Sequence, residues 1–220
     1  LTLPSYRVED LDGRPVEAKI EDLGANFEYD LPKDKFRQAR IARQVRVTIP
    51  VHLAPLSWTT FQLLEGEQEH RDGIYQNGVI DTPFVTLSID DGLTLYDKTT
   101  NEAYEDFLRF EDRGDIGNEY IYFQPKGTEP IYAELTAYEV LENNARYAKI
   151  LLKHDLTIPV SADEQLDAEQ RGIIEFMNRK ASRSEELTTI PLETEMTIFV
   201  DDPQIRFKTR FTNTAKDHRI

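Results

Sequence analysis

The segment from Glu111 to Tyr120 holds the densest group of residues that could do chemistry. It reads EDRGDIGNEY, so several carboxylates, two glycines and an aromatic side chain fall within one short stretch. Such a composition is typical of a loop, and loops that are held by a rigid scaffold often line binding sites. We expect this loop to connect two strands, at residues 107–110 and 121–123.

Three interpretations of this segment are open. A calcium loop is the first, but the spacing D-x-[DN]-x-[DN]-G with a glutamate at position twelve is not met from Asp112 or from Asp115. A glycosidase acid and base are the second, and they require two carboxylates roughly 5–10 Å apart, a distance that a sequence does not show. The third is a tight turn in which Gly114 and Gly117 adopt positive φ while Asp112 and Asp115 cap backbone amides.

A second dense segment, FTNTAKDHR at residues 211–219, follows an alternating strand. Its residue types predict a turn in which Asp217 contacts His218 or Arg219, a structural rather than a catalytic arrangement. Aromatic side chains elsewhere could stack on sugar rings if they are exposed, although core or sheet-edge packing is the commoner use of such residues. The candidates are Trp58, Tyr75, Tyr96, Tyr104, Tyr122 and Tyr132.

Several classes of site find no support in the sequence. The chain of 220 residues has no cysteine, which excludes disulfides, thiolate metal sites and a cysteine nucleophile. The four histidines, His52, His70, His154 and His218, are isolated and form no zinc-binding motif, so we expect no metal site. No glycine-rich phosphate loop and no G-x-S-x-G nucleophile motif is present.

The net charge restricts the partners. With 26 basic and 41 acidic residues the chain carries a formal charge of −15, which repels both nucleic acids and anionic membranes. We therefore expect neither as a partner. The sequence has no long apolar run and no glycosylation sequon, so a reducing cytoplasm is the expected location. The first residues, LTLP, have no initiator methionine, and we expect the chain to be an excised piece of a longer protein.

Alternating apolar and polar residues predict an antiparallel all-β fold. Residues 45–49, VRVTI, are typical of a half-buried strand. Three hairpins are predicted: residues 85–89 with 93–96 across Asp90-Asp91-Gly92, residues 132–141 with 146–154 across Asn143-Asn144, and residues 193–200 with 205–211 across residues 201–204. Strands at this spacing, mostly without helices between them, favour a β-sandwich over a βαβ fold.

One helix and one domain boundary are also predicted. Residues 161–164, SADE, have the form of a capping box, so a short helix could follow over residues 166–180, although Gly172 weakens that prediction. The charged and glycine-containing stretch at residues 65–73 indicates a boundary between a first segment, residues 1–66, and a larger one, residues 67–220.

Three motifs in this order resemble the β-domains of bacterial alpha-mannosidases of glycoside hydrolase family 38. They are DGLTLYDK at residues 91–98, DRGDIGNEYIYFQP at residues 112–125 and FTNTAKDHRI at residues 211–220. The resemblance is clear over residues 73–220 and thinner over residues 1–66. Asn118 departs from the family pattern, which commonly has aspartate there.

The resemblance implies both a fold and a role. It implies a small β-sandwich segment at residues 1–66, followed by the first part of a large galactose-mutarotase-like supersandwich. It also implies a retaining, zinc-dependent enzyme that cleaves terminal alpha-mannosides of glycans or small mannosides. The nucleophile and the zinc of such an enzyme lie in a catalytic α/β domain that these residues do not include. The present residues would then support the catalytic and helical domains and be inactive alone.

In this resemblance one loop approaches the sugar. Tyr120 is the candidate substrate contact, and Asp112, Gly114, Asp115, Gly117 and Glu119 are the residues expected to order its loop, with Asp115 foremost because it lies between the glycines. No residue of the chain is expected to be catalytic. The alternative from another class is a free-standing carbohydrate-binding β-sandwich.

Overall fold

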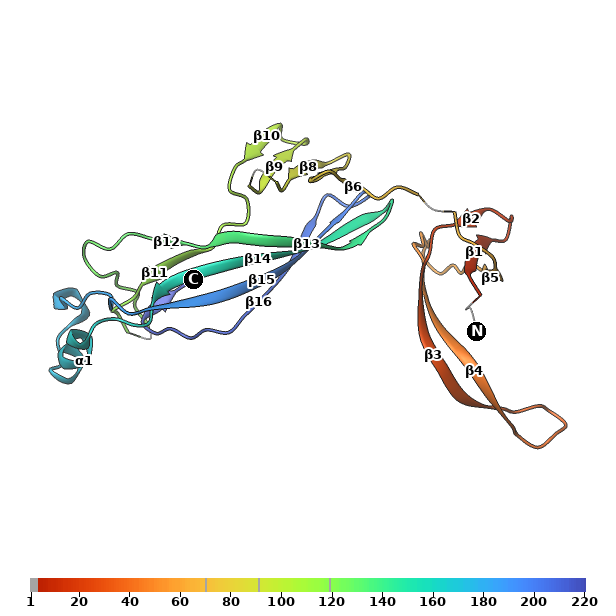
Figure 1. The fold of residues 1–220 in the computed structure, drawn as a ribbon, viewed down its shortest axis with the longest axis horizontal. Helices are drawn as coiled ribbons and strands as arrows, with labels where there is room; N and C mark the ends of the chain where they lie inside the picture. Colours follow the sequence, from red (N-terminus) through yellow and green to blue (C-terminus); the bar gives the residue numbers. More distant parts are fainter. Residues whose placement is uncertain (1–3, 70, 91, 119) are drawn as a thin grey trace. The chain divides into compact units, whose positions relative to one another are not determined.

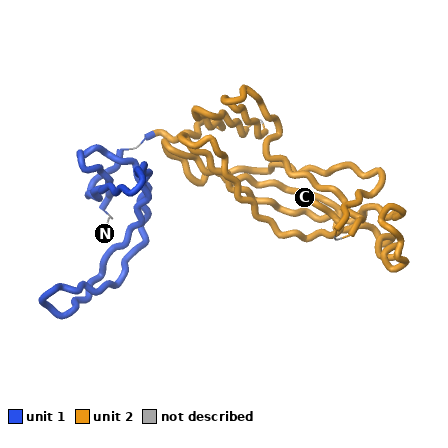
Figure 2. The backbone as a smooth tube through the Cα atoms, turned by 180° about the vertical axis from the view of Figure 1, so that it is seen from behind, with its two compact units in different colours: residues 1–71 blue, residues 72–220 orange. Residues whose placement is uncertain are grey.

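The chain forms two compact units in the computed structural model. The structure describes residues 4–69, 71–90, 92–118 and 120–220. Unit 1 comprises residues 1–71 and unit 2 comprises residues 72–220 (Figure 2). The division falls within the charged stretch at residues 65–73. Among the helices of the described residues, none has the length and apolar character needed to cross a membrane.

Unit 1 contains two small antiparallel sheets (Figure 1). A three-stranded sheet has the order β2-β1-β5, and a separate two-stranded sheet is formed by β3 and β4. The strands are β1 (Tyr6–Asp10), β2 (Pro15–Val16), β3 (Lys19–Asp30), β4 (Gln38–Thr48) and β5 (Phe61–Glu65). The alternating residues 45–48 lie in β4, as the sequence predicts, and they pair with the start of β3.

Unit 2 begins with a five-stranded sheet of order β10-β9-β8-β7-β6. Its strands are β6 (Tyr75–Gln76), β7 (Val79–Asp81), β8 (Val85–Ser88), β9 (Thr94–Asp97) and β10 (Glu102–Tyr104). The first predicted hairpin is confirmed, because β8 pairs antiparallel with β9 and Leu87 faces Leu95. Gly92 in the connection has a φ of +90°, which glycine adopts without strain. Asp91, which the turn prediction includes, lies outside the described residues.

The second sheet of unit 2 has four long strands in the order β13-β14-β15-β16. They are β13 (Glu134–Asn143), β14 (Tyr147–Pro159), β15 (Leu187–Phe199) and β16 (Ile205–Phe211). The two other predicted hairpins are therefore confirmed, with Asn143 facing Ala148 and Ile198 facing Ile205. The Asn144 side chain accepts hydrogen bonds from the amides of Arg146 and Tyr147, which explains why asparagine suits that turn.

The two larger sheets of unit 2 pack face to face as a β-sandwich. One hydrophobic core includes residues from both sheets, so the inward side of each strand supplies every second residue. Its buried members include Ile80, Leu87 and Leu95 from the first sheet and Ile150, Leu152, Met196 and Ile198 from the second. The all-β, antiparallel sandwich predicted from the alternation is thus the observed fold class.

A third, short sheet connects distant parts of unit 2. Its order is β12-β11-β17, and its strands are β11 (Glu111–Gly114), β12 (Ile131–Tyr132) and β17 (His218–Arg219). The prediction of strands at residues 107–110 and 121–123 is wrong, because neither range forms a strand and the strand begins at Glu111 instead. Pairing with residues far along the chain, rather than local alternation, determines where this strand forms.

The predicted helix is shorter than expected. Helix α1 spans Glu164–Arg171, and a 3₁₀ turn follows at Phe176–Asn178. The N-cap is Asp163, whose carboxylate accepts from the amide of Gln165, so the capping role assigned to Ser161 is wrong. Gly172 ends the helix as its C-cap, and the prediction of a helix over residues 166–180 is therefore wrong beyond residue 171.

His154 lies on the inward side of β14, and only 4% of its surface is exposed. Its ring packs edge-on against Phe110, with 5.2 Å between the ring centroids. Its Nδ1 atom finds no hydrogen-bond partner among the described residues. Burial lowers the pKa of His154 from its ordinary value of 6.5, because the charged form would lose its hydration.

We predict that His154 makes unit 2 less stable in acid. The unfolded chain binds a proton near pH 6.5 whereas the folded chain resists it, so the stability is full above that pH and decreases as the pH falls below it. His154→Leu should reduce this loss, which denaturant unfolding at several pH values would measure. His52→Leu is the control, since that imidazole is exposed and stays in water in both states. An identical pH dependence in His154→Leu and the wild type would refute the assignment.

Candidate functional site

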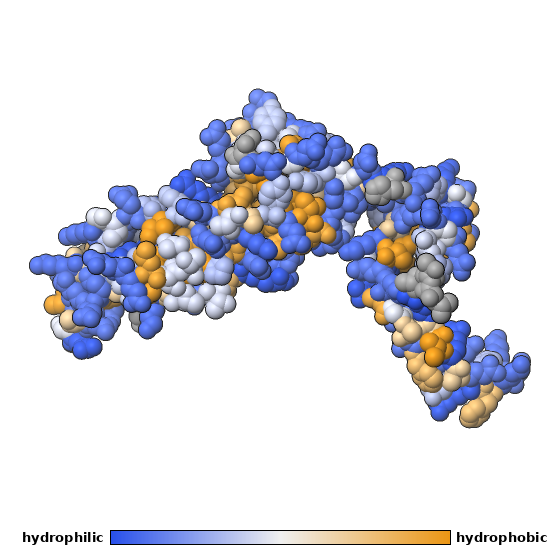
Figure 3. All heavy atoms as spheres, viewed as in Figure 1, coloured by the Kyte–Doolittle hydropathy of each residue, from blue (hydrophilic) through white to orange (hydrophobic). Residues whose placement is uncertain are grey.

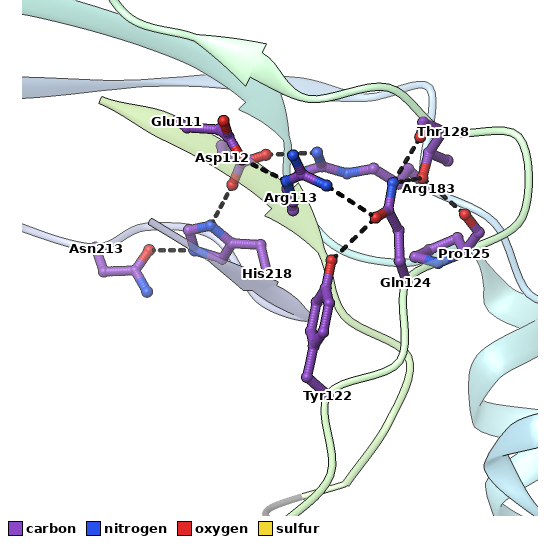
Figure 4. A network of polar contacts seen from close by, with 10 residues as sticks. All are labelled: Glu111, Asp112, Arg113, Tyr122, Gln124, Pro125, Thr128, Arg183, Asn213 and His218. Atoms are coloured by element: carbon purple, nitrogen blue, oxygen red, sulfur yellow. Dashed lines mark hydrogen bonds and ion pairs between the residues drawn. The ribbon is translucent and has the colours of Figure 1, made fainter. Parts of the chain in front are cut away.

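Asp112 is a completely buried carboxylate at the centre of the predicted loop region. None of its side chain is exposed, and it lies on β11, between β12 and β17. One oxygen, Oδ2, accepts from Nη1 of Arg183 at 2.5 Å, and the other, Oδ1, lies 2.6 Å from Nδ1 of His218 (Figure 4). A buried carboxylate is costly unless it is paired, and here the Arg183 guanidinium lies on one oxygen and the His218 ring on the other.

The ring of His218 is held by contacts on both of its nitrogens. Its Nε2 lies 3.0 Å from Oδ1 of Asn213, and the same Asn213 oxygen accepts from the amide of Ala215. That second bond fixes the oxygen, rather than the nitrogen, of the Asn213 amide toward the ring. The two ring nitrogens of His218 therefore each lie within hydrogen-bond distance of an oxygen, which holds the ring between Asp112 and Asn213.

The expected contact of Asp217 with His218 or Arg219 is wrong. Asp217 accepts from the amide of Ala162 through its carboxylate, and its backbone oxygen accepts from the amide of Asp115. Asp217 has a φ of +53° and directly precedes β17. The side chains of His218 and Arg219 in β17 contact Asp112 and Asp115, not Asp217. The FTNTAKDHRI motif thus serves to bring His218 and Arg219 to the two aspartates of the other motif.

Asp115 ties the loop that follows β11. Its Oδ1 accepts from the amides of Gly117 and Phe123, at 2.9 and 3.1 Å, and its Oδ2 accepts from Nε of Arg219 at 2.7 Å. The first two bonds close the loop across its base, and the third attaches it to β17. The Arg219 guanidinium also stacks on the ring of Tyr122, 4.6 Å from its centroid.

The two glycines of the loop are required by close packing and not by their φ angles. The prediction of positive φ at Gly114 and Gly117 is wrong, since neither is in the left-handed region. A Cβ atom at Gly117 would lie 1.8 Å from the carbonyl oxygen of Ile121, and one at Gly114 would lie 3.0 Å from Cδ of Arg183. Any side chain at Gly117 would thus force the two sides of the loop apart.

Tyr120 lies at the exposed end of this loop. Its side chain is 87% exposed, whereas its amide donates to Oδ1 of Asn118 at 2.9 Å. The same Asn118 oxygen accepts from the amide of Ile121, so asparagine performs the turn chemistry that an aspartate would also perform. Glu119, which we expected to help order the loop, lies outside the described residues.

Two arginines that the sequence did not single out bind the loop and the strand before it. Nη1 of Arg179 donates to the carbonyl oxygens of Ile116 and Gly117, at 2.6 Å each, and Arg183 binds Asp112. Both follow α1 in the chain, in a polar stretch with no motif. Of the loop residues singled out from the sequence, the structure therefore brings Asp112 and Asp115 to basic side chains and leaves the ring of Tyr120 in solvent.

A polar chain beside this network stiffens the segment after the loop. The Gln124 side chain accepts from Nη1 of Arg113 and from the hydroxyl of Tyr122, and it donates to the carbonyl of Thr128 (Figure 4). Arg113 also pairs with Glu111. These bonds join both ends of the loop to the three-stranded sheet.

Metal binding has no support in the described part of the chain. No group of three His, Cys, Asp or Glu side chains that could hold an ion occurs among the residues whose positions are described. Both carboxylate oxygens of Asp112 already have side-chain partners, the Arg183 guanidinium and the His218 ring. The arrangement is suited to fixing a loop, and it contains no nucleophile with an adjacent base.

Comparisons with known proteins relate the chain to one enzyme family. Residues 1–65 match the family model described as "Glycosyl hydrolases family 38 C-terminal domain 1". The whole chain superimposes on an alpha-mannosidase from Enterococcus faecalis V583 with a TM-score of 0.80 and 35% identity. The chain is therefore similar to the C-terminal part of glycoside hydrolase family 38 proteins. The matched model lies in residues 1–65, the part in which the motifs show the resemblance less clearly.

Two further relatives cover the entire chain. A second family 38 protein from Enterococcus faecalis has a TM-score of 0.77 and 31% identity. A protein from Halalkalibacterium halodurans, named "Putative mannosylglycerate hydrolase", is 31% identical over 234 aligned residues. The chain spans about a quarter of the length of these relatives: 26% of the Halalkalibacterium protein and 26% and 27% of the two structures.

We predict that removing the carboxylate of Asp112 destabilises unit 2 severely. Asp112→Ala leaves the buried Arg183 guanidinium without its counter-charge and the His218 ring without its hydrogen-bond partner, and breaking one side of a buried ion pair costs about 3–5 kcal/mol. Urea unfolding followed by circular dichroism would measure the loss. Asp167→Ala is the control, because its pair with Arg171 is exposed and should contribute less than about 1 kcal/mol. Equal losses in the two variants would contradict the prediction.

Proposed function

We propose that this chain is the non-catalytic β-domain part of a retaining, zinc-dependent alpha-mannosidase that acts in the cytoplasm. The observation that carries the proposal is the match of all its residues to the alpha-mannosidase structure, at 35% identity and a TM-score of 0.80. In the proposal, a catalytic domain outside this chain holds the zinc and the nucleophile, and the β-sandwich supports that domain and the helical one.

The loop at residues 115–123 would contribute to the rim of the sugar site. Its support is local: Asp115 and Arg179 fix the backbone on both sides of Gly117, while the Tyr120 ring extends into solvent. A phenol held on a fixed loop can bond a sugar hydroxyl or a catalytic carboxylate with little loss of conformational entropy. We assign that role to Tyr120.

The experiment on the enzyme compares two lengths of polypeptide. The full-length protein should release the aryl group from an aryl alpha-mannoside, and a chelator should abolish that activity until zinc is restored. The isolated chain of residues 1–220 should release nothing. Activity in the isolated chain, or none in the zinc-loaded full-length protein, would refute the proposal. Binding of free mannose to the isolated chain would instead favour a carbohydrate-binding module.

Mannosylglycerate is a second candidate substrate, because the Halalkalibacterium relative carries that substrate in its name. The two candidates are separated by the ratio of their kcat/KM values in the full-length protein. An aryl or disaccharide mannoside should be preferred if the Enterococcus alpha-mannosidase is the better guide. A preference for mannosylglycerate would transfer the assignment to that substrate and leave the role of the β-domains unchanged.

We predict that Tyr120→Phe in the full-length protein lowers turnover by about tenfold, the value of one hydrogen bond that is made in the transition state. The melting temperature should change by no more than about one or two degrees, because the hydroxyl is removed from an exposed side chain. The matched control is Tyr104→Phe, at an exposed tyrosine of β10 outside this loop. If kinetics are unchanged in Tyr120→Phe, the residue has no part in substrate contact.

A further inference from the structure

The loop that carries Tyr120 is a narrow hairpin with hydrogen bonds between its two sides. The amide of Ile116 donates to the carbonyl oxygen of Phe123 at 2.8 Å, and the amide of Asn118 donates to that of Ile121 at 3.0 Å. Such bonds fix the shape of a hairpin. A two-stranded hairpin is only marginally stable alone, however, and its end keeps a fixed position only where another element packs against it.

Arg179 reaches this hairpin from the segment that follows α1. Its Nη1 donates to the carbonyl oxygens of Ile116 and Gly117, at 2.6 Å each, and its Nε donates to the carbonyl oxygen of Ile174 at 3.2 Å. One planar guanidinium thus bridges the hairpin and the turn after α1. Lysine cannot replace it, because an ammonium group is a single point on a flexible stem and does not present donors in a fixed fork.

The backbone beside Arg179 is itself tied to α1. The Glu169 carboxylate accepts from the amides of Lys180 and Ala181, at 2.8 and 3.2 Å. The N-cap carboxylate of Asp163 accepts from the amide of Ser182 at 3.0 Å. The side chain of Arg179 therefore extends from a fixed backbone, and it transmits that position to the hairpin.

A small apolar cluster supports the same junction. Its buried members are Ile116, Ala162, Leu166 and Ala181. Two of these four are alanines, and Figure 3 shows a mostly hydrophilic surface at the end of unit 2 that carries α1. Apolar packing is not directional, so the hydrogen bonds of Arg179 are the contacts that determine where the hairpin lies against this cluster.

The turn that Arg179 binds has a strained backbone. Ile173 has a φ of +56°, which a β-branched residue adopts only at a cost, and its side chain is 89% exposed, so burial does not offset that cost. The next residue, Ile174, donates its amide to the carbonyl of Glu169 and offers its own carbonyl to Arg179. Strain of this kind persists where surrounding contacts hold the backbone, and it is common near functional sites.

We infer that Arg179 is a positioning residue, which holds the loop at residues 115–123 so that the Tyr120 hydroxyl meets the substrate. The inference rests on the proposed function, in which Tyr120 contacts the sugar. Arg179 does not touch the substrate, so its effect on turnover passes through Tyr120. A small displacement of a group that contacts the reacting substrate is sufficient to slow the reaction.

The test is a double-mutant cycle in the full-length protein. Arg179→Lys keeps the charge and loses the bridge, so kcat for an aryl alpha-mannoside should fall by roughly threefold to tenfold. In the Tyr120→Phe background the same substitution should change kcat by less than about twofold, because the hydroxyl through which it acts is absent. A loss of folded protein would instead lower kcat in both backgrounds. Arg171→Lys, at an exposed arginine of α1, is the matched control and should behave as wild type.

A second measurement needs no activity. Hydrogen exchange followed by mass spectrometry should show faster exchange in Arg179→Lys for the peptide that contains the amides of Asn118 and Ile121. Peptides from β14 and β15 should exchange as in wild type, since the sandwich core is unaltered.

Three results would overturn the inference: wild-type kcat in Arg179→Lys, an equal loss of kcat in the two backgrounds, or unchanged exchange in the loop. Failure of the proposed function has a different signature. In that case the zinc-loaded wild type hydrolyses no mannoside, or Tyr120→Phe has wild-type turnover. The exchange measurement then decides by itself whether Arg179 holds the loop.

Discussion

The buried carboxylate of Asp112 makes the interactions on which the loop region of unit 2 depends. Its charge is unfavourable inside a protein, and only Arg183 and His218 together make it acceptable. These partners come from the segment after α1 and from the last strand, so one carboxylate joins three parts of the chain that no local rule would bring together. Nε and Nη2 of Arg183 have no partner among the described residues, which makes Asp112 the principal counter-charge for that buried guanidinium.

This ionic centre and the hydrophobic sandwich have different roles. The sandwich core, with Leu87, Leu152 and Ile198 among its members, orients the long strands and supplies most of the apolar burial. The ionic centre buries little apolar surface, but it holds β11 in place against β17. Asp115, just after β11, then attaches the loop to β17 through its bond with Arg219. The two kinds of interaction suit these two roles, because hydrophobic packing is not directional, whereas hydrogen-bonded ion pairs are.

The proposed function requires the backbone of this loop to be held in a fixed position. A residue that contacts a substrate from a neighbouring domain is useful only if its backbone is already fixed, since ordering it on binding would cost affinity. Gly117 permits the tight approach of Ile121, and Arg179 binds the carbonyls on the other side. The exposed Tyr120 ring is then the free end of an otherwise constrained loop.

The sequence by itself determined the all-β class, the three hairpins and the loop as the candidate site. These depend on alternation and on turn residues such as Asn144, which act over a few neighbours. Only the tertiary structure decided the partners of Asp112, because Arg183 is 71 positions away and His218 is 106 positions away. It also decided the close packing of Gly114 against Arg183, a residue far along the chain. Such contacts arise when the chain folds back on itself, and no local pattern encodes them.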